Sequence, residues 1–187
     1  MPLTRVLPAF LLLGASLAGC GHLVYPSGPY RGRVVDAETK QPLAGAAVLA
    51  VWRWGGPGLG HPSEGFHDAL EVLTDANGEF VVPRKTHFIF SIFAEVEEPH
   101  FIIYYPGYGS FPLYHVQPTG AALDSAFREH TVVELPRLKT YEERLRAAGI
   151  PSGAVGVPDE KMPNLIHLIN QERRALGAPP IHTEKAK

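Results

Sequence analysis

The stretch Ala46-Ala-Val-Leu-Ala-Val-Trp-Arg-Trp54 decides the fold class of this 187-residue chain. Successive side chains of an extended strand point to opposite sides, so residues 46–54 present two faces. These faces consist of Val48, Ala50, Trp52 and Trp54 on one side, and Ala47, Leu49, Val51 and Arg53 on the other. Both faces are apolar as far as Arg53, which is typical of a strand covered on both sides. We therefore expect a central strand of a sheet here.

Short strands with turn residues between them flank this central strand. Alternating side chains predict strands near residues 30–34, 70–74, 80–82, 88–93, 101–105 and 131–135. Asp75-Ala-Asn-Gly78 predicts a tight hairpin, because Asn-Gly readily adopts the positive φ angles of such a turn. About seven short strands, in a chain with 19 Gly and 18 Pro residues, predict an all-β fold of the seven-stranded β-sandwich type.

Three segments of this region carry a family resemblance. They are Gly32-Arg-Val-Val-Asp36 with Thr39-Lys-Gln-Pro-Leu-Ala-Gly-Ala46, then Thr74-Asp-Ala-Asn-Gly-Glu-Phe80, and Tyr104-Tyr-Pro-Gly-Tyr108. Together they resemble the carboxypeptidase regulatory-like domain, over residues 30–138. The resemblance implies a seven-stranded transthyretin-like (Ig-like) β-sandwich. It implies little about function, because this fold serves as an accessory, adhesive or binding module in many contexts.

The N-terminus has the features of a secretory targeting segment. Arg5 precedes an apolar run over residues 6–13, which is too short to span a bilayer but suits a signal peptide. Leu17-Ala-Gly-Cys20 then resembles the lipobox of bacterial lipoproteins. This resemblance implies a signal peptide over residues 1–19 and acylation of Cys20 by a diacylglycerol thioether and a fatty acid such as palmitate. An ordinary secretory signal with a chance cysteine is the alternative.

Residues 20–29 contain several Gly and Pro residues and are expected to form a lipidated tether. Gly21, rather than Asp, follows Cys20. In Gram-negative lipoproteins, the absence of Asp directly after the acylated cysteine implies the outer membrane. The resemblance therefore places the protein on the periplasmic face of that membrane. The membrane is then one partner, through the lipid anchor at Cys20. The formal net charge of −2 and the lack of a Lys/Arg cluster argue against a nucleic-acid partner.

The tail over residues 139–187 is expected to be a helical extension. Helices are predicted over residues 141–148 and from Asp159 to about Leu176. The second helix carries an apolar stripe of Leu165, Leu168, Ile169 and Leu176. This stripe either packs on the β-sandwich or binds a partner.

The candidate chemistry is sparse. The Gly-rich residues 55–67 are expected to form a long loop, in which His61 and His67 are the candidates for metal ligands. No residue pattern indicates a catalytic constellation, so we expect a protein that is not an enzyme and needs no cofactor.

Aromatic residues are the remaining candidates for ligand or partner contact: Trp52, Trp54, Tyr104, Tyr105 and Tyr108. Core packing is the alternative role for them. We expect a non-enzymatic, lipid-anchored envelope protein that acts as a binding or structural module for a protein partner or an envelope component. The alternatives are an accessory lipoprotein that binds carbohydrate or peptidoglycan through exposed aromatics, and a metal-binding protein or enzyme that uses the loop histidines.

Overall fold

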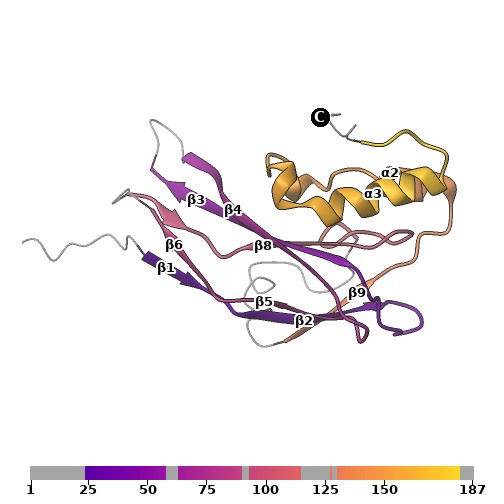
Figure 1. Ribbon diagram of the computed structural model, residues 1–187, viewed down its shortest axis with the longest axis horizontal. Helices are drawn as coiled ribbons and strands as arrows, with labels where there is room; N and C mark the ends of the chain where they lie inside the picture. Colours follow the sequence, from indigo (N-terminus) through magenta and orange to yellow (C-terminus); the bar gives the residue numbers. More distant parts are fainter. Residues whose placement is uncertain (1–23, 58–62, 90–92, 115–126, 128–129, 182–187) are drawn as a thin grey trace, which may run out of the picture.

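The computed structural model describes residues 24–57, 63–89, 93–114, 127 and 130–181 (Figure 1). These described residues form nine strands, which are β1 (Val24–Ser27), β2 (Tyr30–Asp36), β3 (Ala47–Gly56), β4 (Ser63–Leu73), β5 (Glu79–Val82), β6 (Lys85–Phe88), β7 (Glu95–Val96), β8 (His100–Tyr104) and β9 (Thr131–Leu135). Helical segments follow, which are α2 (Tyr141–Ala147), the 3₁₀ turns η1 (Ser152–Ala154) and η2 (Asp159–Lys161), and α3 (Pro163–Ala175). The prediction of an all-β fold with a helical C-terminal extension is confirmed, with nine strands in place of about seven.

The strands form two larger sheets and one two-stranded ribbon. β3 lies at the centre of one sheet, paired with β4 on one edge and with β8 and β7 on the other. β2 lies at the centre of the second sheet, antiparallel to β5 and parallel to β9. β1 and β6 form the ribbon. The central position predicted for residues 46–54 is therefore confirmed.

The first core lies between the two larger sheets. One face of β3 and β8 contributes Val48, Ala50, Trp52, Phe101 and Ile103 to this core. The second sheet contributes residues from all three of its strands, which are Tyr30, Val34, Phe80, Val82, Val133 and Leu135. Figure 1 shows these strands lying in two layers.

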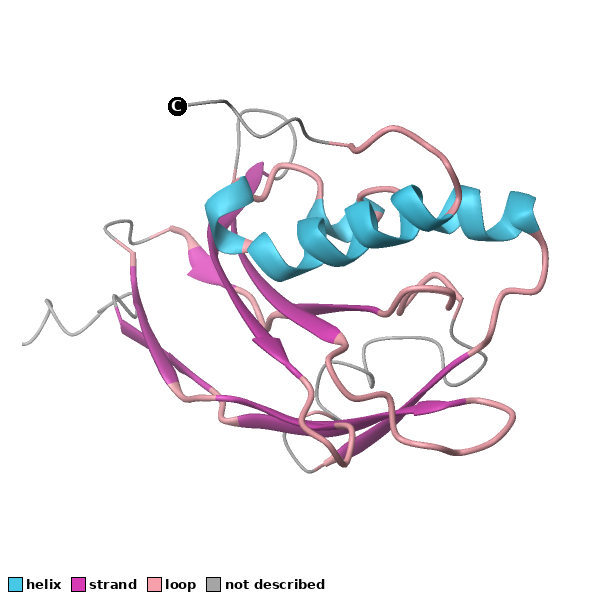
Figure 2. Ribbon diagram, turned by 45° about the vertical axis from the view of Figure 1, so that its right-hand side comes forward, coloured by secondary structure: helices cyan, strands magenta, loops and turns pink. Residues whose placement is uncertain are grey.

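The second core lies on the other face of β3 and β8, under the helices. Leu49, Val51, Ile102 and Tyr104 pack there against Leu165 and Ile169 of α3. Figure 2 shows α3 lying across this sheet as a third layer. Leu165, Leu168 and Ile169 of the predicted stripe therefore pack on the sheet, whereas Leu176 lies past the end of α3. This packing explains why residues 46–54 are apolar on both faces.

Side chains of the sheet and of α2 hold α3 in place. Met162 occupies the N-cap position of α3 and offers no capping side chain. Glu71 of β4 substitutes for a cap, because its carboxylate accepts the backbone N–H groups of Asn164 at 2.8 Å and Leu165 at 2.6 Å. Arg144 of α2 forms a two-point ion pair with the buried Glu172 of α3, at 2.7 and 3.0 Å.

Three expectations about element boundaries need correction. Residues 24–27 of the expected tether form β1, because they pair with β6. The strand expected at 88–93 shares only Phe88 with the observed strand Lys85–Phe88, and residues 90–92 lie outside the described residues. The second tail helix begins at Pro163, whereas Asp159–Lys161 forms a 3₁₀ turn.

The long loop expected over residues 55–67 is wrong at both of its ends, because β3 and β4 continue into it as paired strands, and residues 58–62 lie outside the described residues. β3 runs to Gly56 and β4 begins at Ser63. Gly65 lies under the indole of Trp54, where a Cβ atom would come within 2.6 Å of the ring nitrogen. The register shifts between Trp52 and Arg53, which leaves His67 as the extra residue of a β-bulge and interrupts the sequence alternation.

Candidate functional site

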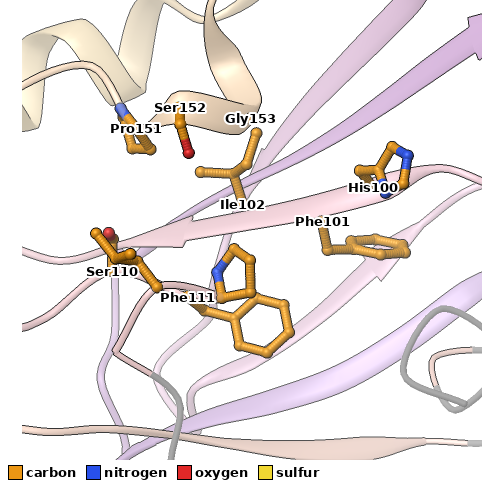
Figure 3. Close-up of a pocket in the computed structure, with 10 residues that line it drawn as sticks. His100, Phe101, Ile102, Ser110, Phe111, Pro151, Ser152 and Gly153 are labelled. Atoms are coloured by element: carbon orange, nitrogen blue, oxygen red, sulfur yellow. The ribbon is translucent and has the colours of Figure 1, made fainter. Parts of the chain in front are cut away.

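A pocket of about 410 Å³ lies where β8, the segment 108–113 and the η1 turn meet (Figure 3). This volume falls within the range of small-ligand pockets, roughly 300–1,000 Å³. Phe101, Ile102, Phe111 and Pro151 supply apolar lining, and the polar lining comes from His100, Ser110 and Ser152. The mixture suits an apolar group that also makes one or two hydrogen bonds.

Backbone contacts build the lower wall of this pocket. Phe111 pairs with Ile103 of β8 in an isolated bridge, with N–H···O distances of 2.9 and 3.3 Å. The chain reaches this position through a turn at Gly107, which has a φ of +81°. The segment 108–113 therefore runs along β8 and places Ser110 and Phe111 at the pocket.

The η1 turn forms the opposite wall. Gly153 lies against Ile102, and a Cβ atom at residue 153 would approach the Ile102 side chain to 3.2 Å. Glycine therefore allows the turn to pack this closely on β8. Figure 3 shows Pro151 and Ser152 across from Ser110, with Ile102 between the two walls.

The aromatic residues predicted to contact a ligand are divided between the two cores and half-buried positions. Trp52 is buried in the first core and donates its indole N–H to Ser27 Oγ at 2.8 Å. Tyr104 is buried in the second core, and Tyr108 is buried beside Asp36. Trp54 and Tyr105 are half-buried. The five side chains therefore do not form the jointly exposed surface that an aromatic platform requires.

Of the two predicted candidates for metal ligands, only His67 lies within the described residues. Cys20 and His61 lie outside the described residues. His67, in the bulge of β4, packs its ring edge-on against His87 of β6, with 5.2 Å between ring centroids. In the part of the chain that the structure describes, no three His, Cys, Asp or Glu side chains are grouped as metal ligands.

His87 is a buried polar residue that the sequence patterns did not single out. Only 2% of its surface is exposed, and its Nε2 atom has no hydrogen-bond partner among the described residues. Burial, together with the nearby charges of His67 and Lys85, lowers the pKa of His87 to about 4. In β6 the polar His87 faces inward and the apolar Phe88 faces outward. This order is the reverse of what their polarities predict, so the sequence carried no signal for a buried histidine.

Asp36, Tyr108 and Arg137 form a polar cluster at the end of β2. Asp36 Oδ2 accepts the Tyr108 hydroxyl at 2.8 Å and an Arg137 N–H at 3.3 Å. Backbone N–H donation from Thr39, with further bonds from Tyr108, Glu38 and Arg137, holds the pKa of Asp36 well below its usual range. Burial and the contact with Asp36 raise the pKa of Tyr108. A tyrosine hydroxyl held in this way is suited to structural support rather than to proton transfer.

The comparisons with known proteins identify no family. No family model matches the chain, and no curated protein matches it. Among solved structures, a 9R-lipoxygenase from Cyanothece PCC8801 aligns at 16% identity, with a TM-score of 0.23. The alignment covers 44% of this chain and 11% of the lipoxygenase chain, and a likeness this low carries no argument about fold or activity. None of the described helices is long and apolar enough to cross a membrane.

Proposed function

We propose that the protein is a non-enzymatic, lipid-anchored component of the bacterial envelope that binds a partner through the pocket beside β8. The proposed partner is a protein segment or another envelope component with an apolar group. The proposed fold family is the transthyretin-like β-sandwich of carboxypeptidase regulatory-like domains. The proposed location is the periplasmic face of the outer membrane.

The pocket is the observation that carries the binding role. The pocket combines apolar lining with polar groups. Leu113 lies at the rim of the pocket, and 73% of the surface of Leu113 is exposed. Exposed apolar groups beside a hollow are typical of sites that bury part of a partner. The polar lining consists of His100, Ser110 and Ser152, which can offer hydrogen bonds to a partner whose apolar group fills the hollow.

The lipobox resemblance supports the anchoring role. Leu17-Ala-Gly-Cys20 follows a short apolar run, and Cys20 is the only cysteine of the sequence. Two or more acyl chains give stable membrane attachment, whereas one gives only marginal binding.

Site-specific crosslinking in cells tests the binding role. A photoreactive amino acid at Leu113 is expected to give a discrete adduct, whereas the same residue at the exposed Val132 of β9 serves as the matched control. Ser152→Trp, which fills the pocket from its rim, should abolish the Leu113 adduct and leave thermal unfolding unchanged. Equal adducts from Leu113 and Val132, or an adduct that survives Ser152→Trp, would overturn the proposed site.

Fatty-acid labelling tests the anchoring role. Cys20→Ala is expected to remove palmitate labelling and to leave unprocessed precursor, because the acceptor thiol is lost. Labelling that persists in Cys20→Ala would overturn the proposed anchor.

A further inference from the structure

Large apolar side chains are exposed at the end of the molecule where the described chain begins. Val24 is 47% exposed, Phe88 is 61% exposed and Phe93 is 70% exposed. Val24 and Phe88 are direct partners in the β1–β6 ribbon, so their side chains share one face. The hydroxyl of Tyr25 donates to the carbonyl of Ala94 at 3.1 Å, which holds the segment of Phe93 beside β1. We call Val24, Phe88 and Phe93 the anchor end.

The anchor end lies next to the proposed lipid attachment, so this inference rests on the proposed function. Val24 follows Cys20 by four positions, and an extended chain advances at most about 3.5 Å per residue. Val24 therefore lies within about 14 Å of the acylated cysteine. The polar region of a bilayer is roughly 5–8 Å thick on each side. A tether this short allows the anchor end to reach the lipid headgroups.

The charges beside Phe93 indicate which lipid surface fits. Glu64, Glu95 and Glu97 line a shallow hollow together with Phe93 and residues 55–57. Lys85 of the neighbouring ribbon is paired with Asp68, so its charge does not offset these carboxylates. Anionic lipid would repel this hollow, whereas the ammonium group of a zwitterionic phosphatidylethanolamine can pair with it.

We infer that the anchor end, Val24, Phe88 and Phe93, rests on zwitterionic lipid headgroups when Cys20 is acylated. The β1–β6 ribbon then meets the membrane directly. In Figure 1 this ribbon lies near the tip of the β3–β4 hairpin, while β9 lies towards the opposite end. The molecule therefore has a fixed orientation on the membrane, rather than moving freely on a long tether.

A fluorescent probe on the full acylated protein tests this orientation. Because acylation consumes the thiol of Cys20, a cysteine introduced by substitution is the only free thiol to be labelled with a nitrobenzoxadiazole dye. Phe88→Cys and Phe93→Cys place the probe at the anchor end, and Val132→Cys on β9 is the control. The protein is reconstituted into phosphatidylethanolamine-rich vesicles with headgroup-labelled nitroxide lipid, and circular dichroism checks the fold.

The expected result is at least threefold stronger nitroxide quenching at residues 88 and 93 than at residue 132. Equal quenching at all three positions overturns the inference. A dye at residue 93 that is shielded from water but not quenched by the nitroxide lipid also overturns it. The second of these outcomes would indicate a protein that covers the anchor end. Mass spectrometry of the same sample separates the two proposals. Acylated protein without quenching overturns the orientation alone, whereas an unmodified Cys20 overturns the anchor and the orientation together.

Lipid composition tests the charge argument. Raising the phosphatidylglycerol fraction from zero to one half should lower quenching at residue 93 at least twofold, because the acidic hollow is repelled. Replacing Glu64, Glu95 and Glu97 by Gln should remove this dependence. Quenching that rises with phosphatidylglycerol would overturn the preference for zwitterionic lipid.

Discussion

Tyr108 donates its hydroxyl proton to Oδ2 of Asp36 at 2.8 Å, across 72 residues of sequence. The other carboxylate oxygen, Oδ1, accepts the backbone N–H groups of Glu38 and Thr39 at 2.8 and 2.9 Å. The carboxylate therefore joins the turn after β2 to the loop after β8. Two of the three segments that carry the family resemblance meet at this point.

Removing either partner of this bond should destabilise the protein. Tyr108→Phe is expected to cost about 1–2 kcal/mol in the free energy of unfolding, because it loses the bond donated to Asp36 and the bond accepted from Arg137 at 2.6 Å. Asp36→Asn is expected to cost about 2–3 kcal/mol, because a charge-assisted acceptor of several donors is lost. Urea unfolding of both variants and of the double variant measures the coupling. Tyr141→Phe, at an exposed tyrosine, is the control, and equal losses in Tyr108→Phe and Tyr141→Phe would contradict the prediction.

The buried His87 should make the fold sensitive to mild acid. Its pKa is about 4 in the folded protein against 6.5 for an unperturbed histidine, so the unfolded chain binds the proton first. The contribution of neutral His87 to the free energy of unfolding is then complete above pH 6.5. This contribution falls as the pH drops towards 4, by at most about 3 kcal/mol. Burial is the main cause. His67 and Lys85 act in the same direction, and Asp68 opposes them.

His87→Leu tests this acid sensitivity. The variant removes both the titrating group and a buried Nε2 atom that has no partner in the described part of the chain, so it should flatten the fall in stability between pH 6.5 and 4. Its stability at pH 7 is expected to equal or exceed that of the natural sequence. Urea unfolding across this pH range provides the measurement, with His167→Leu on the exposed face of α3 as the control. A steep fall retained in His87→Leu would contradict the assignment.

Local sequence patterns were sufficient where the polarity or turn preference of each residue matches its place in the fold. The two apolar faces of residues 46–54 predict a central strand because two separate cores cover them. Asp75-Ala-Asn-Gly78 forms the predicted tight turn, in which Gly78 adopts a φ of +74°. The predicted hairpin is wrong, because β4 pairs with β3 and β5 pairs with β2, so the turn joins two different sheets. The full length of the β3–β4 pairing was not predicted, because its glycines, which usually indicate a loop, here make room for packing such as that of Trp54 over Gly65.

The pocket was not predictable from local patterns. Ser110 and Ser152 lie 42 residues apart in sequence and belong to irregular segments, so no periodicity relates them. Aromatic residue type alone was also insufficient to find a site. Trp52 and Tyr104 are of the same residue types as aromatics that lie on binding surfaces, but both are buried. Only the docking of η1 on β8 brings the two walls of the pocket together.

Glu71 should be important for docking α3 on the sheet. Glu71→Ala removes the acceptor for the N–H groups of Asn164 and Leu165, and is expected to cost about 1–2 kcal/mol. Glu71→Gln keeps one acceptor oxygen but loses the charge, so its loss should be smaller. Thermal unfolding measures both, with Glu64→Ala, at an exposed position of the same strand, as the control. A loss in Glu64→Ala as large as that in Glu71→Ala would show that the cap contributes nothing.

Deleting residues 139–187 should abolish cooperative unfolding, because the helices complete the second core. The deletion uncovers Leu49, Val51, Ile102 and Tyr104, each of which is at most 1% exposed in the intact chain. The truncated chain is therefore expected to bind a hydrophobic dye and to lose a sharp thermal transition. Ile169→Ala tests the same packing within the full chain, with an expected loss of about 2–5 kcal/mol from the cavity it creates. Arg174→Ala, at an exposed position of the same helix, should change stability little. A truncated chain that unfolds cooperatively, together with a small loss in Ile169→Ala, would show that the sheets are stable without their helical layer.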